Sequence, residues 1–177
     1  MAEADRERWD AKHRALGAGT PLPPDALRGR LDLVPSTGRA LDVACGRGGV
    51  AVWLAARGLD VVAVDVSPAG LAAGAALADD HDVRVRWVEA DLDGGFPDED
   101  GTYDLVVCQR FRDPALYPAL AAAVAPGGLL VISVRSEVGD EGGRFRAAPG
   151  ELAAAFGDLE VLAHHEGDGE AYLLARG

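Results

Sequence analysis

From Arg39 onward, short apolar segments alternate with longer segments rich in Ala and Leu. The short segments have the length and composition of buried strands: ALDVA, DVVAVDV, VRVRWVEAD, YDLVVCQ and LLVISV. The segments between them are typical of helices: GVAVWLAARG, AGLAAGAALA and PALYPALAAAVA. Strands that alternate with helices in this way predict a parallel sheet with helices on both faces.

The last two strand-like segments, LEVLAHH and EAYLLAR, are separated only by EGDG. A connection this short cannot hold a crossover helix, so we expect the two strands to form an antiparallel hairpin. The expected fold class is therefore α/β, with a seven-stranded, mostly parallel, Rossmann-like sheet and an antiparallel last strand. In such a sheet, ligands bind beyond the carboxyl ends of the strands.

The first 38 residues lack this alternation. The segment ERWDAKHRALG predicts a short helix that ends at Gly17, and a Pro- and Gly-rich link leads to a short apolar helix through Leu27, Leu31 and Leu33. No repeat or low-complexity linker divides the sequence, and 177 residues are enough for one domain with a sizeable core. We expect a single domain over 1–177, with 1–38 as an N-terminal helical cap and 39–177 as the core.

The composition narrows the possible partners. The chain carries 17 Lys and Arg residues and 29 Asp and Glu residues, which gives a net charge of −12. A surface this acidic repels phosphate backbones and anionic lipids, so neither nucleic acid nor a membrane is an expected partner. The apolar runs are too short to span a bilayer, and the N-terminal MAEADRERWDAKHR has no apolar signal core. We expect a cytoplasmic protein that is a monomer or a homodimer.

A glycine turn follows the first predicted strand in ALDVACGRGG, and three kinds of ligand compete for it. A P-loop would need a Lys after the glycines, and none is present. A dinucleotide site would need G-x-G-x-x-G/A, which Gly46, Gly48 and Ala51 satisfy, with Asp65 near the position of the ribose-binding acid. Asp42 favours the third ligand, S-adenosylmethionine, because an acid beside the turn would repel a pyrophosphate but suits a ligand that carries an ammonium and a sulfonium.

The chain resembles the class I S-adenosylmethionine-dependent methyltransferases over nearly all of its length. The motifs that carry the resemblance are LDVACGRGG, VVAVDVS, VEADLDGGFP, YDLVVCQRF and APGGLLVIS, in this order. The resemblance implies that Asp65 accepts hydrogen bonds from both ribose hydroxyls and that Asp91 accepts one from the adenine amino group. It also implies that Val66 and Leu92 supply apolar faces for the purine.

These motifs imply that S-adenosylmethionine, or its product S-adenosylhomocysteine, is bound without a metal. The cofactor-binding residues expected are Trp9, Asp42, Ala44, Cys45, Gly46, Gly48, Asp65, Val66, Ser67, Ala90, Asp91, Leu92, Cys108 and Gln109. The two cysteines have neither disulfide nor metal spacing, and we expect both to be small buried thiols.

A narrower resemblance, to small bacterial methyltransferases of the tellurite-resistance and thiopurine group, rests on RWDAKHR, QRFRDPALYPALAAAVAPGGLL and GRFRAAPGEL. Relatives in that group commonly have Tyr where this chain has His13. The resemblance supports an N-terminal lid in which Trp9 closes over the cofactor, and packing of Trp9 in the core is an equal alternative. One helical turn separates Trp9 from His13, so both are expected on one helix face.

Candidate residues for the methyl acceptor follow the predicted strand ends, apart from His13 in the predicted N-terminal helix. His13, Arg110 and Arg135 are the catalytic or acceptor-binding candidates, and Arg144 and Arg146 would suit an anionic acceptor unless they form surface ion pairs. His164 and His165 are adjacent and point to opposite faces of a strand, so we do not expect a metal site there.

The sequence thus predicts a methyltransferase that acts on a small-molecule acceptor. Two alternatives remain open. One is a module that binds S-adenosylmethionine or S-adenosylhomocysteine without catalysis, and the other is an NAD-dependent oxidoreductase, which Asp42 and the final hairpin disfavour.

Overall fold

The computed structural model describes residues 2–95, 101–140, 142–143 and 145–177. Residue contacts group the chain into two compact units. The first comprises Met1–Pro23 and Pro35–Gly101, and the second comprises Pro24–Val34 and Thr102–Gly177. The assignment of the whole chain to a single domain with an N-terminal cap stays a prediction.

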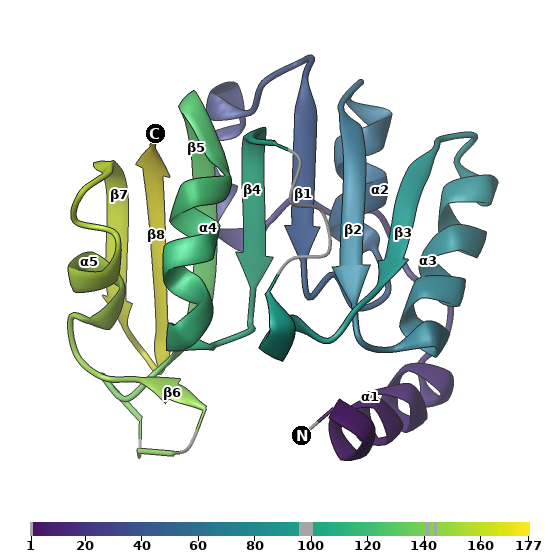
Figure 1. Cartoon of the computed structure of the whole chain (residues 1–177), viewed down its shortest axis with the longest axis horizontal. Helices are drawn as coiled ribbons and strands as arrows, with labels where there is room; N and C mark the ends of the chain where they lie inside the picture. The colour runs from purple at the N-terminus through teal and green to yellow at the C-terminus, as the bar shows by residue number, and fades with distance from the viewer. Residues whose placement is uncertain (1, 96–100, 141, 144) are drawn as a thin grey trace. The chain divides into compact units, whose positions relative to one another are not determined.

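The first unit has a three-stranded parallel sheet with the strand order β3-β2-β1. Its elements are α1 (Ala2–Ala15), β1 (Arg39–Val43), α2 (Gly49–Ala56), β2 (Asp60–Asp65), α3 (Pro68–Asp80), β3 (Val85–Glu89) and the 3₁₀ helix η3 (Leu92–Gly94). All residues of β1 after Arg39 are buried, as expected of a parallel strand covered on both faces. Helix α1 packs against α3, and Figure 1 shows it at the end of α3 that follows β2.

Trp87 on β3 packs into a notch that exists only because two facing residues are glycines. A Cβ on Gly48 would lie 2.3 Å from the indole ring, and a Cβ on Gly74 would lie 2.6 Å from it. The same ring covers the buried residues Val52 and Leu77. This packing fixes the glycine turn after β1 against α3 and β3.

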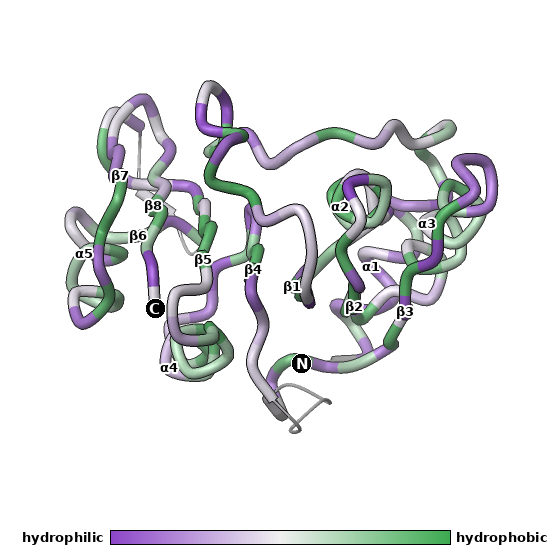
Figure 2. Tube along the Cα trace, turned by 90° about the horizontal axis from the view of Figure 1, so that it is seen from above, coloured by the Kyte–Doolittle hydropathy of each residue, from purple (hydrophilic) through white to green (hydrophobic). Residues whose placement is uncertain are grey.

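The second unit has the strand order β4-β5-β8-β7. Its elements are η1 (Asp25–Leu27), η2 (Leu31–Leu33), β4 (Tyr103–Gln109), η4 (Pro114–Leu116), α4 (Tyr117–Ala123), β5 (Val124–Ser136), β6 (Arg146–Ala147), α5 (Glu151–Ala155), β7 (Glu160–Gly167) and β8 (Glu170–Arg176). Strand β4 pairs with β5 in parallel, whereas β8 pairs with β5 and with β7 in the antiparallel direction. The hydropathy colours of Figure 2 show the apolar stretches of β5 and α4 in green.

These strands confirm the predicted α/β fold class: the sheet is mostly parallel, and its last strand is antiparallel. One addition is β6, a two-residue strand within the loop predicted after β5, where Arg146 pairs with Arg135. A second difference is that the segment predicted as one apolar helix forms η1 and η2, because Gly29 between them adopts a left-handed φ of 76° that interrupts a helix. Strand β5 also begins at Val124, within the segment PALYPALAAAVA that the sequence predicted as a helix.

Candidate cofactor site

The turn between β1 and α2 has left-handed backbone at three alternate residues. The φ angles are 53° at Ala44, 56° at Gly46 and 69° at Gly48. The turn is closed by hydrogen bonds from Cys45 N to Val64 O at 3.0 Å and from Gly48 N to Cys45 O at 2.9 Å. Two of the left-handed positions carry glycine, for which this conformation costs little, whereas Ala44 has a Cβ and is strained.

Asp42 lies in β1, just before this turn, and is only 3% exposed. The backbone N–H of Ala51 donates a hydrogen bond to its carboxyl, and within the described residues Oδ2 has no partner. Burial, together with the nearby Asp65 carboxyl, raises the pKa of Asp42 to about 8. A cationic donor at the unpartnered oxygen would favour the ionised carboxylate and offset the cost of burying its charge.

Asp65 joins the end of β2 to the glycine turn. Its Oδ2 accepts a hydrogen bond from Gly46 N at 2.7 Å, and its Oδ1 accepts one from Ser67 N at 2.9 Å. Ser67 is the N-cap of α3, since its Oγ accepts a hydrogen bond from Gly70 N at 3.0 Å. Each carboxylate oxygen of Asp65 retains a further lone pair for a ligand.

The residues after β3 complete this edge of the first unit. Ala90 N donates to Asp65 O at 3.0 Å, which ties the end of β3 to the end of β2. Asp91 is exposed and is the N-cap of η3 through a 3.1 Å hydrogen bond from Asp93 N to its Oδ1. Leu92 is buried beside it. The acids Asp42, Asp65 and Asp91 therefore lie in or directly after three neighbouring parallel strands.

The thiol of Cys45 is half-buried in the turn, and burial, together with the carboxyls of Asp42 and Asp65, raises its pKa well above the ordinary value. It is thus a neutral thiol rather than a thiolate. Cys108 is fully buried in β4 of the second unit, with its Sγ 3.7 Å from Phe111 O. In residues 2–95, 101–140, 142–143 and 145–177, no group of three or more His, Cys, Asp or Glu side chains is arranged to hold a metal.

Helix α1 brings His13 to the glycine turn and carries Trp9 on the same helix face. The rings of Trp9 and His13 stack with centroids 5.8 Å apart, which confirms that they share a helix face. Atom Cε1 of His13 lies 3.4 Å from the position that a Cβ on Gly46 would take. Burial lowers the pKa of His13, and among the described residues its Nδ1 has no hydrogen-bond partner. His13 is therefore a neutral imidazole against the turn.

Asp10 on α1 is a site residue that the sequence did not reveal. It is 8% exposed and accepts hydrogen bonds from Ser67 Oγ at 2.5 Å and from Ala69 N at 3.1 Å. These contacts, led by the hydrogen bond from Ser67, lower the pKa of Asp10. Asp10 caps a helix through a residue 57 positions further along the chain, and such a contact leaves no local sequence pattern. The only feature of the sequence that pointed to Asp10 was its position next to Trp9.

The remaining predicted residues belong to the second unit. Gln109 Oε1 accepts a hydrogen bond from Asp25 N at 3.1 Å, and Arg110, which has a left-handed φ of 55°, lies 3.4 Å from the Asp25 carboxylate. Arg135 is exposed on β5. Arg146 forms a 2.5 Å ion pair with Asp140. This contact agrees with the predicted alternative that Arg146 forms an ion pair and does not bind an anionic acceptor. Arg144 lies outside the described residues.

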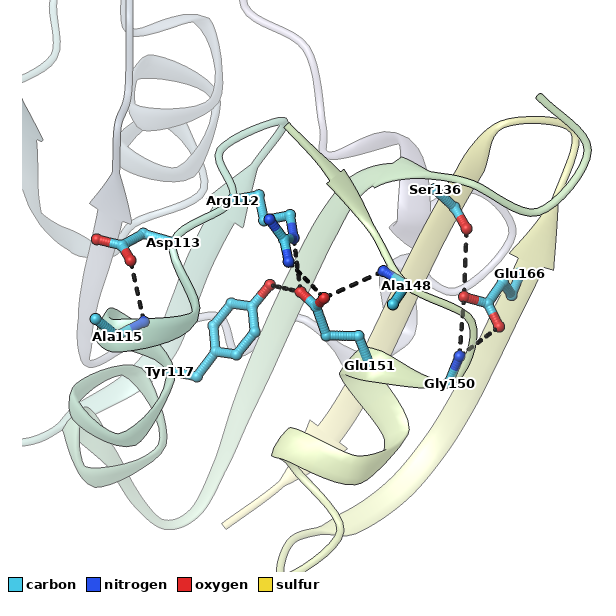
Figure 3. A network of polar contacts seen from close by, with 9 residues as sticks. All are labelled: Arg112, Asp113, Ala115, Tyr117, Ser136, Ala148, Gly150, Glu151 and Glu166. Atoms are coloured by element: carbon cyan, nitrogen blue, oxygen red, sulfur yellow. Dashed lines mark hydrogen bonds and ion pairs between the residues drawn. The ribbon is translucent and has the colours of Figure 1, made fainter. Parts of the chain in front are cut away.

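A polar network in the second unit was not foreseen (Figure 3). The Glu151 carboxylate accepts hydrogen bonds from Arg112 Nη2 at 2.6 Å and from Tyr117 Oη at 2.8 Å, and it also accepts one from Ala148 N at 3.1 Å. Pairing with Arg112 lowers the pKa of Glu151. These bonds hold the start of α5 against the segment that follows β4.

The ring of His165 stacks on the ring of Tyr172, with the two centroids 5.4 Å apart.

The first unit thus has a glycine turn, a buried unpaired acid before it, and two further acids after the neighbouring strands. These features define a Rossmann-like α/β protein that is built to bind a nucleoside cofactor at the carboxyl edge of its sheet. Residues 40–128 match the family described as the methyltransferase domain. The chain belongs to this family, and specifically to the class I S-adenosylmethionine-dependent methyltransferases.

Three known proteins illustrate the likeness. The ribosomal RNA small subunit methyltransferase C of Chromohalobacter salexigens is 34% identical over 139 residues, which cover 73% of this chain and 38% of that protein. The demethylmenaquinone methyltransferase of Thermus thermophilus is 35% identical over 132 residues, or 71% of this chain and 60% of that protein. The chain therefore spans less than two thirds of the length of these relatives.

TehB from Haemophilus influenzae has a similar fold, with a TM-score of 0.76, 20% sequence identity, and coverage of 95% of this chain and 66% of that one. At this level of identity the likeness concerns the fold alone. In the part of the chain that the structure describes, no helix is long and apolar enough to cross a membrane.

Proposed function

We propose that this chain transfers the methyl group of S-adenosylmethionine to a small-molecule acceptor. The observation that carries the proposal is the buried carboxyl of Asp42, whose Oδ2 has no partner within the described residues. A buried polar atom of this kind requires a donor, and the ammonium group of S-adenosylmethionine is one. The carboxyl supplies no positive charge to the pyrophosphate of NAD, and its ionised form would repel that group, which disfavours an oxidoreductase.

The residues along the same edge fit the rest of the cofactor. Asp65 would accept from the two ribose hydroxyls with the lone pairs that Gly46 N and Ser67 N leave unused. Asp91 would accept from the adenine amino group, and Val66 and Leu92 would pack against the purine. Ala44, Cys45, Gly46 and Gly48 would allow the methionine portion to approach the backbone of the turn.

When bound, S-adenosylmethionine supplies a methyl group that its sulfonium already activates. The contribution of the chain is therefore to bind the cofactor, to orient the acceptor in line with the methyl group and to exclude water. Trp9 and His13 of α1 would cover the methionine portion, since His13 lies against Gly46. Because burial keeps His13 neutral near pH 7, its imidazole is in the form that a base needs for a hydroxyl or amine acceptor.

A small-molecule acceptor is favoured over RNA by charge. The net charge of −12 opposes the approach of a phosphate backbone. Of the two relatives named above, one is a demethylmenaquinone methyltransferase and the other a ribosomal RNA methyltransferase, so both acceptor classes belong in the test. The roles of Arg110 and Arg135 as acceptor contacts stay predictions.

The experiment is a transfer assay with S-adenosylmethionine that carries an isotopic label on its methyl group. Thiols, phenols, amines, chalcogen oxyanions and a ribosomal RNA fragment are offered as acceptors, and labelled product is measured by mass spectrometry. Label on one class of small molecule supports the proposal, and label on RNA alone contradicts the small-molecule acceptor. Binding of S-adenosylhomocysteine without transfer to any acceptor would favour the non-catalytic binding module.

A further inference from the structure

A continuous series of hydrogen bonds runs from α1 to the glycine turn within the first unit. The hydroxyl of Ser67 donates to Asp10 Oδ1 at 2.5 Å, and the backbone N–H of Ser67 donates to Asp65 Oδ1 at 2.9 Å. The other oxygen of Asp65 accepts from Gly46 N at 2.7 Å. Ser67 therefore stands between a carboxylate of α1 and the carboxylate proposed to bind the ribose.

Asp10 and Ser67 together satisfy the first turn of α3. Asp10 Oδ1 accepts from Ala69 N at 3.1 Å, while Ser67 Oγ accepts from Gly70 N at 3.0 Å. A negative charge at a helix N-terminus is stabilised by the helix dipole, and these N–H groups have no partner inside the helix. Asp10 is also buried, so its charge depends on these donors and on Arg14, whose Nη2 lies 3.3 Å from Oδ2.

The same face of α1 contacts the glycine turn. His13 lies three residues after Asp10, and its ring packs against Gly46 and Gly70 with no room for a side chain at Gly70. A Cβ on Gly70 would lie 2.6 Å from Gly46 O and 3.1 Å from the His13 ring. Helix α1, the start of α3 and the glycine turn therefore meet at van der Waals distance, and movement of α1 must disturb the other two.

We infer that Asp10 is a positioning residue of the cofactor site, which holds Ser67, and through it Asp65, in the arrangement that receives the ribose. Docking of α1 and binding of the cofactor are then coupled, and by linkage a bound cofactor strengthens the docking of α1. This inference rests on the proposed function in that it takes Asp65 as the ribose-binding acid. A purely structural Asp10 would affect stability and leave this coupling unchanged.

The test compares the wild-type chain with Asp10→Ala and Asp10→Asn, and Glu7→Ala is the matched control on the same helix. Calorimetry measures the affinity for S-adenosylhomocysteine, and hydrogen exchange measures protection of residues 2–15 with and without this ligand. Asp10→Ala should weaken binding by between about 5-fold and 100-fold and should abolish the ligand-dependent protection. Asp10→Asn keeps an oxygen that can accept a hydrogen bond from Ser67. Its affinity for S-adenosylhomocysteine should therefore lie between those of the wild type and Asp10→Ala. Glu7→Ala removes an exposed acid from the same helix and should bind as the wild type does.

The outcomes separate the two levels of the proposal. The role of Asp10 would be overturned if the wild type binds S-adenosylhomocysteine without protection of α1. It would also be overturned if the wild type and Asp10→Ala bind with equal affinity. Either result would leave the proposed function intact. No binding of S-adenosylhomocysteine by the wild type would overturn both. If Asp10→Ala does not fold, the variants Asp10→Asn and Ser67→Ala provide the test. The inference would be overturned if both variants bind S-adenosylhomocysteine as tightly as the wild type and show the same protection of α1.

Discussion

The side chain of Asp65 holds the backbone of Gly46 at the glycine turn, with 2.7 Å between Oδ2 and the amide nitrogen. The second oxygen holds the start of α3 through Ser67 N. One carboxylate at the end of β2 therefore connects two loops that would otherwise be independent. This connection places a negative charge with unused lone pairs at the carboxyl edge of β1 and β2, where a ribose diol is expected.

Replacement of Asp65 by Ala removes both connections and the proposed ribose acceptors. Hydrogen bonds to a charged group contribute about 1.5–3 kcal/mol each, so affinity for S-adenosylhomocysteine should fall at least about 100-fold. Calorimetry measures the loss, and Asp80→Asn, at an exposed acid near the end of α3, is the matched control. Unchanged affinity in Asp65→Ala would remove the assigned role of this residue.

Asp42 should make the stability of the unliganded chain depend on pH. Its pKa is about 8 when folded against an ordinary value of 3.8, so the folded state holds the proton more tightly. The stabilisation is fully present below the unfolded pKa and is lost as the pH rises through about 8. Asp42→Asn resembles the protonated form and should lose less stability over this range.

Urea unfolding near pH 5 and near pH 8 measures this difference for both forms. The wild type should be markedly less stable at the higher pH, and the pH-dependent loss should be smaller in Asp42→Asn. Equal losses in the two proteins would show that the carboxyl of Asp42 is not the group responsible.

Replacement of Ala44 by glycine should increase the stability of the folded chain, although glycine usually lowers stability relative to alanine. Its left-handed φ of 53° costs a residue with a Cβ about 1–2 kcal/mol, which glycine does not incur. The gain from Ala44→Gly should be about 1 kcal/mol after the larger chain entropy of unfolded glycine is subtracted. Ala76→Gly, at an exposed position inside α3, should have the opposite effect of about 1 kcal/mol. Thermal unfolding of both variants measures the signs, and destabilisation by both would contradict the strain at Ala44.

Gly70 should not tolerate even a methyl group. Alanine normally stabilises a helix relative to glycine, but at this position its Cβ would lie 2.6 Å from Gly46 O. Gly70→Ala should therefore lower the stability of the chain and weaken binding of S-adenosylhomocysteine. Gly17→Ala is the control, because a Cβ there meets no atom within 4 Å. A Gly70→Ala variant as stable as the wild type would mean that α3 can move away from the turn without loss.

The sequence predicted the elements that depend on local patterns. The strand segments are indicated by their apolar composition, and the start of α3 is indicated by Ser67 and Pro68, which are typical of a helix N-terminus. Both features are present in the structure. The contact of Asp10 with Ser67 could not be predicted, because it joins residues 57 apart that follow no periodic pattern. The same holds for the Arg112–Glu151 pair and for β6, whose two residues depend on pairing with β5. The strain at Ala44 was hidden because alanine has no conformational signature of its own.

Calorimetric titration with S-adenosylmethionine near pH 6.5, in two buffers with different protonation enthalpies, tests most directly whether Asp42 receives the ammonium group of the cofactor. Asp42 is protonated in the free protein at this pH and must ionise beside the ammonium, so the wild type should release about one proton on binding. Asp42→Asn should bind more weakly and release none. Binding without proton release by the wild type, or binding of NAD in place of S-adenosylmethionine, would contradict the account.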